Sequence, residues 1–164
     1  MESEQTHSQV DKWMARRHYM MLGLNLVVSL VIMYFVMFTM IWSLDHLFNN
    51  SNTFYMAVMM VTPMGILMLM MMGMMYPNRK LNLLLYALFA LLFILALWSM
   101  RAQALVGDRQ FVRAMIPHHA GAILMCNRAS LQDAEIRDLC FKPGGIVDSQ
   151  TREIAQMKAF LARK

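Results

Sequence analysis

The stretch LNLLLYALFALLFILALWSM, residues 81–100, decides the fold class, because it contains no Asp, Glu, Lys or Arg. A helix rises about 1.5 Å per residue and the hydrocarbon core of a bilayer is about 30 Å thick, so about 20 apolar residues span it. Two further uncharged segments, residues 19–44 and 54–76, are longer still. Since apolar residues make up 59% of the chain and charged residues only 15%, we expect three transmembrane helices in a lipid bilayer (residues 19–100).

The distribution of Lys and Arg predicts the orientation of these helices. The tail at residues 1–18 and the loop at 77–80 carry basic residues close to the helix ends, whereas the loop at 45–53 carries none. Because Lys and Arg in short loops mark the cytoplasmic side, we expect residues 1–18 to be a cytoplasmic tail. We expect the membrane to be a bacterial inner membrane, so that residues 101–164 form an extracytoplasmic, periplasmic domain. The basic residues of this domain oppose the assignment, but long segments count weakly.

The net charge of +5 does not indicate a nucleic-acid partner, because the basic residues are scattered and do not alternate with aromatic residues. The sequence also has no recognisable phosphate-binding loop, and no nucleophile stands in an evident pairing with a base. We therefore expect neither a nucleic-acid-binding protein nor an enzyme.

Residues 107–164 have the pattern of an α-helical hairpin. The first helix is predicted from about Asp108, as its N-cap, to Ser130, and Asp133 is predicted to cap a second helix. The breaker at residues 142–145 ends that helix, and the last helix resumes near Asp148. The apolar spacing predicts an inward stripe on each long helix. These stripes are Phe111, Met115, His118, Ala122, Met125 and Ala129 on the first, and Gln150, Ile154, Met157 and Leu161 on the last.

The two cysteines of the chain, Cys126 and Cys140, lie on either side of the predicted turn. A domain this small usually needs a staple, a metal or a partner. In an oxidising compartment the two thiols can form a disulfide, which for a loop of about 15 residues contributes about 3 kcal/mol in the chain-entropy model. Two free cysteines in the core are the alternative.

The residues that carry chemistry lie on the first hairpin helix. Met115, His118 and His119 are three and four positions apart, so their side chains share adjacent parts of one helical face, with Met125 two turns from His118. Thioether and imidazole ligands together favour Cu(I) over Mg, Ca or Mn, and Met157 on the last helix offers another sulfur. Zinc and di-iron sites fit less well, because they use more Cys, His or Glu ligands. In the alternative interpretation, these residues are core packing.

Two other features bear on metal binding. His46, beside Asp45 at the outer end of the first segment, is a possible additional ligand. The segment at residues 54–76 contains ten of the 21 methionines, and five of them recur every fourth residue. They are Met56, Met60, Met64, Met68 and Met72. Such a stripe suits either a conduit for Cu(I) or the adaptable packing of an ordinary apolar residue.

The motif Met-Ile-Pro-His-His-x-x-Ala-Ile-x-Met at 115–125, with Ser-Gln-x-x-Glu-Ile-x-x-Met at 149–157, resembles the family of domain of unknown function 305. The preceding Met-rich helices are similar to its membrane-anchored members. The resemblance implies a ferritin-like helical fold, an extracytoplasmic location and, in some members, copper binding through His and Met. Carried over by position, it implies the ligands Met115, His118, His119, Met125 and Met157, with Gln150 and Glu153 lining the same bundle.

One departure from the family pattern affects the register. Eight residues separate Cys140 from Ser149, where members of the family have about five, so 143–145 looks like an insertion. Three residues make almost one helical turn, which leaves open the height of Met157 relative to His118.

These observations predict an all-α protein in which three transmembrane helices carry a ferritin-like α-hairpin. Because a lone hairpin buries little apolar surface, we expect a homodimer whose two hairpins form a four-helix bundle. The predicted function is that of a membrane-anchored copper-binding protein, which sequesters copper or hands it over. The alternatives are a Met-lined membrane conduit for Cu(I) and a structural membrane subunit without a metal.

Overall fold

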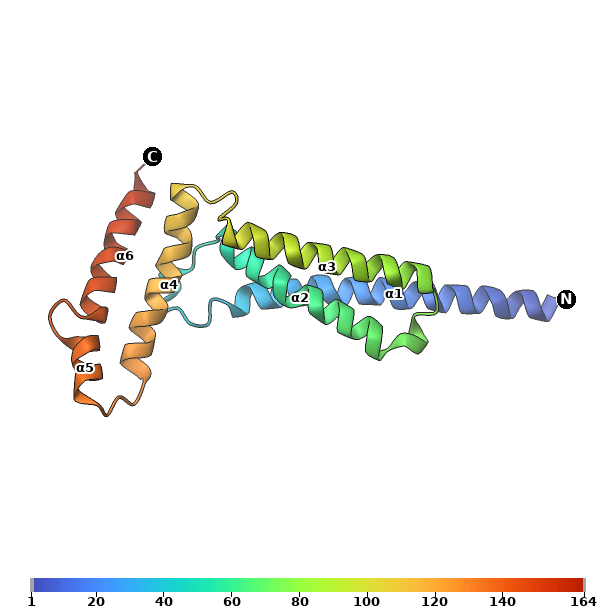
Figure 1. The fold of residues 1–164 in the computed structure, drawn as a ribbon, viewed down its shortest axis with the longest axis horizontal. Helices are drawn as coiled ribbons and strands as arrows, with labels where there is room; N and C mark the ends of the chain where they lie inside the picture. The colour runs from blue at the N-terminus through green and yellow to red at the C-terminus, as the bar shows by residue number, and fades with distance from the viewer. Residues whose placement is uncertain (1, 164) are drawn as a thin grey trace. The chain divides into compact units, whose positions relative to one another are not determined.

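The structure is a computed structural model that describes residues 2–163, with side chains from residue 13 onward. These residues form α-helices and short 3-10 turns without a strand, which confirms the all-α class (Figure 1). The elements are α1 (Glu2–Val36), η1 (Leu44–His46), α2 (Ser51–Met71), η2 (Gly73–Met75), α3 (Arg79–Arg101), α4 (Asp108–Arg128), α5 (Ala134–Phe141) and α6 (Ile146–Ala162). The chain divides into two compact units, which we describe separately.

The first unit, here the membrane unit, comprises Met1–Tyr34 and Tyr55–Ala102. Within the described residues, three helices are long and apolar enough to cross a membrane, namely Trp13–Val36, Ser51–Met71 and Arg79–Arg101. The sequence prediction of three membrane-length helices is therefore confirmed. Helix α1 ends at Val36, however, whereas the predicted segment continues to residue 44. Its last carbonyls are satisfied by a tighter turn and by the Thr39 hydroxyl, which donates to the Val36 carbonyl at 2.8 Å.

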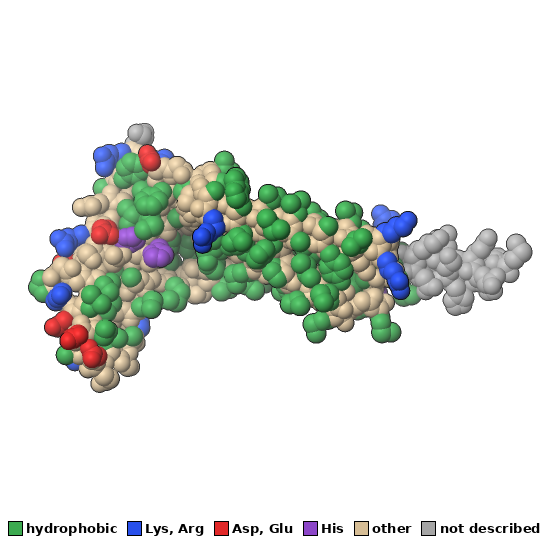
Figure 2. Space-filling model, viewed as in Figure 1, with side chains coloured by type: hydrophobic (Ala, Val, Ile, Leu, Met, Phe, Trp, Pro, Cys, Tyr) green, Lys and Arg blue, Asp and Glu red, His purple; other side chains and the backbone are tan. Residues whose placement is uncertain are grey.

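The core of the membrane unit lies where the three helices pack together. Its buried residues are Leu22, Leu26, Val61, Leu69, Tyr76 and Phe89. Gly65 permits this packing, because a Cβ atom there would lie 2.9 Å from the Phe89 ring. Hydrophobic side chains cover much of the visible surface of this unit (Figure 2), as expected of helices that face lipid.

The methionine stripe of α2 does not form the buried line of the helix. That line is Ala57, Val61, Gly65 and Leu69, which recur every fourth residue. Met64 and Met68 pack partly against the core, whereas Met60 and Met72 are exposed. The stripe is therefore divided between packing and the outer surface of the unit.

The second unit, here the hairpin unit, comprises Phe35–Phe54 and Gln103–Lys164. Helices α4 and α6 lie side by side in it (Figure 1). Its core is formed by Ile116, Ala120, Ile123 and Ile154. On α6 the predicted inward residues Ile154, Met157 and Leu161 do face this core, and Gln150 is half-buried.

The predicted inward stripe of α4 is wrong, because the helix is rotated relative to it. Helix α4 buries Ile116, Ala120 and Ile123 against α6, whereas Phe111 and Met125 are 52% and 59% exposed. His118 and Ala129 are also exposed, and Met115 and Ala122 are half-buried. The observed arrangement buries β-branched and small side chains in the hairpin core and keeps His118 outside it, which avoids the cost of burying a polar ring there.

The helix ends of the hairpin follow local rules. Asp133 caps α5 as predicted, since its side chain accepts a hydrogen bond from the Ile136 amide at 3.1 Å. Gly107, and not Asp108, is the N-cap of α4. The breaker ends α5 at Phe141, and α6 begins at Ile146, slightly before the predicted start. Gly145 is required at this join, because a Cβ atom would lie 2.8 Å from the Leu139 carbonyl oxygen.

Residues 37–50, which connect α1 to α2 and are here named the strap, pack against the hairpin. Ile41 and Phe48 join the periphery of the hairpin core. Asp45 forms an ion pair with Lys158 of α6, and the Trp42 ring lies 6.0 Å from the Arg128 guanidinium. The loop between the first two membrane helices is thus part of the hairpin unit, a long-range contact that the sequence pattern does not indicate.

Candidate metal centre

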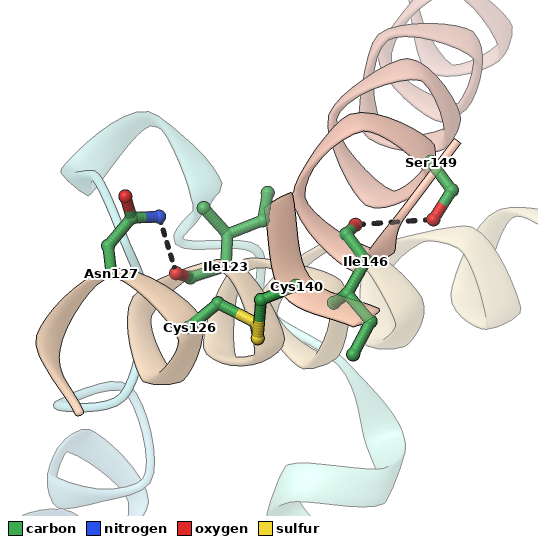
Figure 3. Close-up of a disulfide and its surroundings, with 6 residues drawn as sticks. All are labelled: Ile123, Cys126, Asn127, Cys140, Ile146 and Ser149. Carbon is green, nitrogen blue, oxygen red and sulfur yellow. Dashed lines mark hydrogen bonds between the residues drawn. A yellow bond between two sulfur atoms is a disulfide. The ribbon is translucent and has the colours of Figure 1, made fainter. Parts of the chain in front are cut away.

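A disulfide between Cys126 and Cys140 fixes the closed end of the hairpin (Figure 3). It joins α4 to α5, with both cysteines buried and their Cα atoms 5.7 Å apart. Ile123 and Ile146 lie beside it in Figure 3. The predicted disulfide is therefore present, and the alternative of two free cysteines does not apply.

His119 is the best-defined polar side chain of the candidate centre. Its Nε2 atom lies 2.7 Å from Oε2 of Glu153 on α6, and its Nδ1 atom lies 2.9 Å from the Met115 carbonyl oxygen one turn earlier on α4. The imidazole is largely buried, whereas the Glu153 carboxylate is half exposed. Both ring nitrogens therefore have oxygen partners, and the ring is held in one orientation between the two helices.

The His119–Glu153 contact also fixes the register of the two antiparallel helices. Met115 lies four residues before His119 on α4, and Met157 lies four residues after Glu153 on α6, so each is about one helical turn from the contact. A second contact agrees with this register, since the Arg109 guanidinium donates to the Arg163 carbonyl at 3.2 Å. Met115 and Met157 thus lie at one level of the hairpin, one turn from the His119–Glu153 level. The residues at 143–145 leave this pairing of the two levels in place.

The remaining predicted ligands are more dispersed. The His118 ring lies beside the His119 ring, with centroids 6.2 Å apart, and is exposed. Met125 lies seven residues beyond His118, which is about 10 Å along the helix axis. The arrangement therefore gathers Met115, His118, His119 and Met157 within about one helical turn and leaves Met125 apart from them. Gln150 lies one turn from Glu153 toward the disulfide.

His46 lies in the strap, within η1, and is 8% exposed. Its Nε2 atom is 3.9 Å from the Asp45 carboxylate, and its buried Nδ1 atom has no hydrogen-bond partner among the described residues. Burial lowers the pKa of His46, and the nearby Lys158 adds to this effect, while Asp45 opposes it. The hydrogen bonds from Lys158 and Ser43 lower the pKa of Asp45 to about 2.

The donor set of the centre is suited to a soft cation. Among the side chains that the structure describes, which are those of residues 13–163, no group of three or more His, Cys, Asp or Glu is placed to hold a metal ion. The candidate ligands are instead two thioethers, from Met115 on α4 and Met157 on α6, and the imidazole of His119 one turn away on α4. Such ligands select Cu(I) among the common metal ions.

These observations define a class of protein: an all-α chain in which three membrane-length apolar helices precede a disulfide-bridged helical hairpin. Residues 96–161 match the family described as "Domain of unknown function (DUF305)". The chain is also 31% identical over 116 residues to "Uncharacterized protein L153" of Acanthamoeba polyphaga mimivirus, which covers 68% of this chain and 71% of that protein. The chain therefore belongs to the DUF305 family. No solved structure matches it.

Proposed function

We propose that the hairpin unit binds copper, as Cu(I) in preference to Cu(II), on the outer side of a membrane in which the three apolar helices anchor it. The observation that carries this proposal is the register of the hairpin. It places Met157 of α6 at the same level as Met115 and one turn from His119, so that two thioether residues and one histidine lie on neighbouring turns of two helices that pack together. The proposed first ligands are Met115, His119 and Met157, with His118 beside them at the exposed side.

Glu153 orients His119 for this role. Metal-binding histidines commonly donate their second ring N–H to a carboxylate, which fixes the tautomer and the ring. With Glu153 at Nε2, copper binding would leave the ring proton on that nitrogen, while Nδ1, which here faces a carbonyl acceptor, would release its proton to solvent and bind the metal. Binding then requires His119 Nδ1 to leave the Met115 carbonyl, which is 2.9 Å away. Glu153→Gln keeps a hydrogen-bond acceptor at nearly the same place, so it should weaken copper binding less than Glu153→Ala.

A second copy of the chain is the expected partner of the hairpin. The face of α4 that carries Phe111, His118 and Met125 is exposed along the length of the helix, and histidine side chains are visible on the hairpin surface in Figure 2. Two hairpins packed through these faces give a four-helix bundle and a larger core. We expect Phe111→Glu with Met125→Glu to yield monomers in detergent, measured by light scattering, while Phe141→Glu on α5 leaves the dimer intact.

The protein is proposed to sequester copper or to hand it over, without catalysing a reaction. A copper conduit through the membrane unit is less well supported, because the buried line of α2 consists of Ala57, Val61, Gly65 and Leu69. The methionines at this helix are partly exposed, as lipid-facing or packing residues are.

A titration of the full-length protein in detergent with Cu(I), against a competing chelator, tests the proposal. Wild type should bind copper tightly and His118→Ala/His119→Ala should lose that binding, whereas Met60→Leu/Met64→Leu/Met68→Leu in the membrane unit should retain it. Equal binding by wild type and the histidine variant would overturn the hairpin site. Loss of binding only in the membrane variant would move the site to α2.

A further inference from the structure

The strap also carries apolar side chains that the hairpin core leaves partly or largely exposed. Trp42 and Leu47 are 43% and 39% exposed, and Leu44 is 84% exposed. Together with the end of α1 they form one side of an open groove of about 480 Å³. The groove is lined by Phe35, Phe38, Thr39, Ile41, Trp42, Ser43, Leu44 and Leu47. A continuous exposed apolar patch of this kind marks an interaction site.

The composition of the strap points to lipid as the occupant. Asp45 is the one charged residue among residues 37–50, and its carboxylate is paired with Lys158. The outward side chains that line the groove are thus aliphatic and aromatic, apart from two hydroxyl groups. Tryptophan beside a membrane helix prefers the boundary between headgroups and acyl chains, where the ring is in apolar surroundings and the indole N–H meets water.

The connectivity gives the groove its position. The strap begins at the end of α1 and leads directly into α2, and both of these helices are long and apolar enough to cross a membrane. Two consecutive spans emerge on the same side of a bilayer, so a connection of 14 residues starts and ends at one membrane surface. The chain connectivity therefore keeps the strap, with its apolar groove, within reach of that membrane surface.

We propose that the strap is an interfacial foot, which inserts Trp42, Leu44 and Leu47 among the lipid acyl chains and holds one chain in its groove. The strap also packs on the hairpin, through Ile41, Phe48 and the Asp45–Lys158 pair. The foot therefore ties the hairpin to the membrane surface by contacts additional to the covalent connection through residues 102–107.

Quenching of Trp42 fluorescence by brominated lipid tests the foot. The full-length variant Trp13→Phe/Trp98→Phe keeps Trp42 alone and is reconstituted into phosphatidylcholine vesicles, either plain or brominated near the top of the acyl chains. A matched control removes Trp42 as well and carries Phe141→Trp, because Phe141 on α5 is similarly exposed, at 51%. We expect acyl bromines to lower the Trp42 emission about twofold and aqueous iodide to have little effect, with the reverse for the control.

Three results would overturn the proposal. Emission from Trp42 that responds to iodide and not to acyl bromines would place the strap in water. Emission that responds to neither would show that protein, such as a second copy, covers the groove. The third result comes from adding Leu44→Asn/Leu47→Asn to the variant that keeps Trp42 alone. Both positions are exposed, so the hairpin should stay folded. Bromine quenching of Trp42 as strong as without these two changes would contradict insertion through the leucines.

Discussion

Removing the Cys126–Cys140 disulfide should loosen the hairpin unit and leave the membrane unit unchanged. The bridge closes a loop with a sequence separation of 14, and the chain-entropy relation gives about 3 kcal/mol for a loop of about 15 residues. Because about 1.4 kcal/mol corresponds to a tenfold change in an equilibrium constant, the opening equilibrium of the hairpin should rise about 100-fold. Cys126→Ala/Cys140→Ala also removes two buried sulfur atoms, so its effect should be at least this large.

Hydrogen exchange of the full-length protein in detergent measures this change segment by segment. Amides in α4 and α6 should exchange about 100-fold faster in the alanine variant, while amides in α3 keep their wild-type rates. Chemically reduced wild-type protein is the matched control, because it loses the bridge and keeps both sulfur atoms. Exchange in α4 and α6 that rises by less than about tenfold in both proteins would refute the entropic account of the bridge.

Three further predictions concern the hairpin unit. Ile116→Ala, at a fully buried site, should destabilise the hairpin by about 2–5 kcal/mol, whereas Phe141→Ala, at an exposed site on α5, should cost much less in a denaturant titration. Gly145→Ala should cost about 1–3 kcal/mol because its Cβ meets backbone carbonyls, and Gly107→Ala, in open space, should cost well under that in the same titration. His46 has a lowered pKa, so below its ordinary value of 6.5 the unfolded state binds more protons and packing of the strap should weaken as pH falls. Strap hydrogen exchange, corrected for intrinsic rates, should show this weakening in wild type and not in His46→Phe.

The membrane helices could be predicted because their signal is local. Each uncharged segment is long enough to span a bilayer whatever its neighbours are, so composition and length suffice. The Asp133 cap and the breaker at residues 142–145 were predictable for the same reason, whereas the cap of α4 is Gly107 and not the predicted Asp108. The end of α1 could not be predicted in this way, because residues 37–44 are also apolar. These residues contribute to packing on the hairpin and to the lining of the groove.

The buried face of α4 could not be predicted from the spacing of its apolar residues. The helix carries two apolar stripes at heptad-like spacing, one through Met115 and Ala122 and the other through Ile116 and Ile123. Both satisfy the same periodicity, and the choice between them depends on which surface α6 contacts. The second stripe has the β-branched residues, a signal that favours the tighter packing, but spacing alone does not rank it first.

The contacts that define the candidate centre are long-range. His119 and Glu153 are 34 positions apart, and Asp45 and Lys158 are 113 apart. Spacing on one helix indicated Met115, His118 and His119, and the family resemblance added Glu153 as a lining residue. The pairing of Glu153 with His119 depends on how the turn at residues 142–145 sets the register, which no local pattern determines.

X-ray absorption at the copper edge of the Cu(I)-loaded, full-length protein tests the central claim most directly, because it reports the atoms bound to the metal. We predict a first shell that contains both sulfur and imidazole nitrogen. The sulfur contribution should fall in Met115→Leu/Met157→Leu, and the imidazole signal should be lost in His118→Ala/His119→Ala. A shell of sulfur alone that survives both sets of substitutions would contradict the account and assign copper to the methionines of the membrane unit.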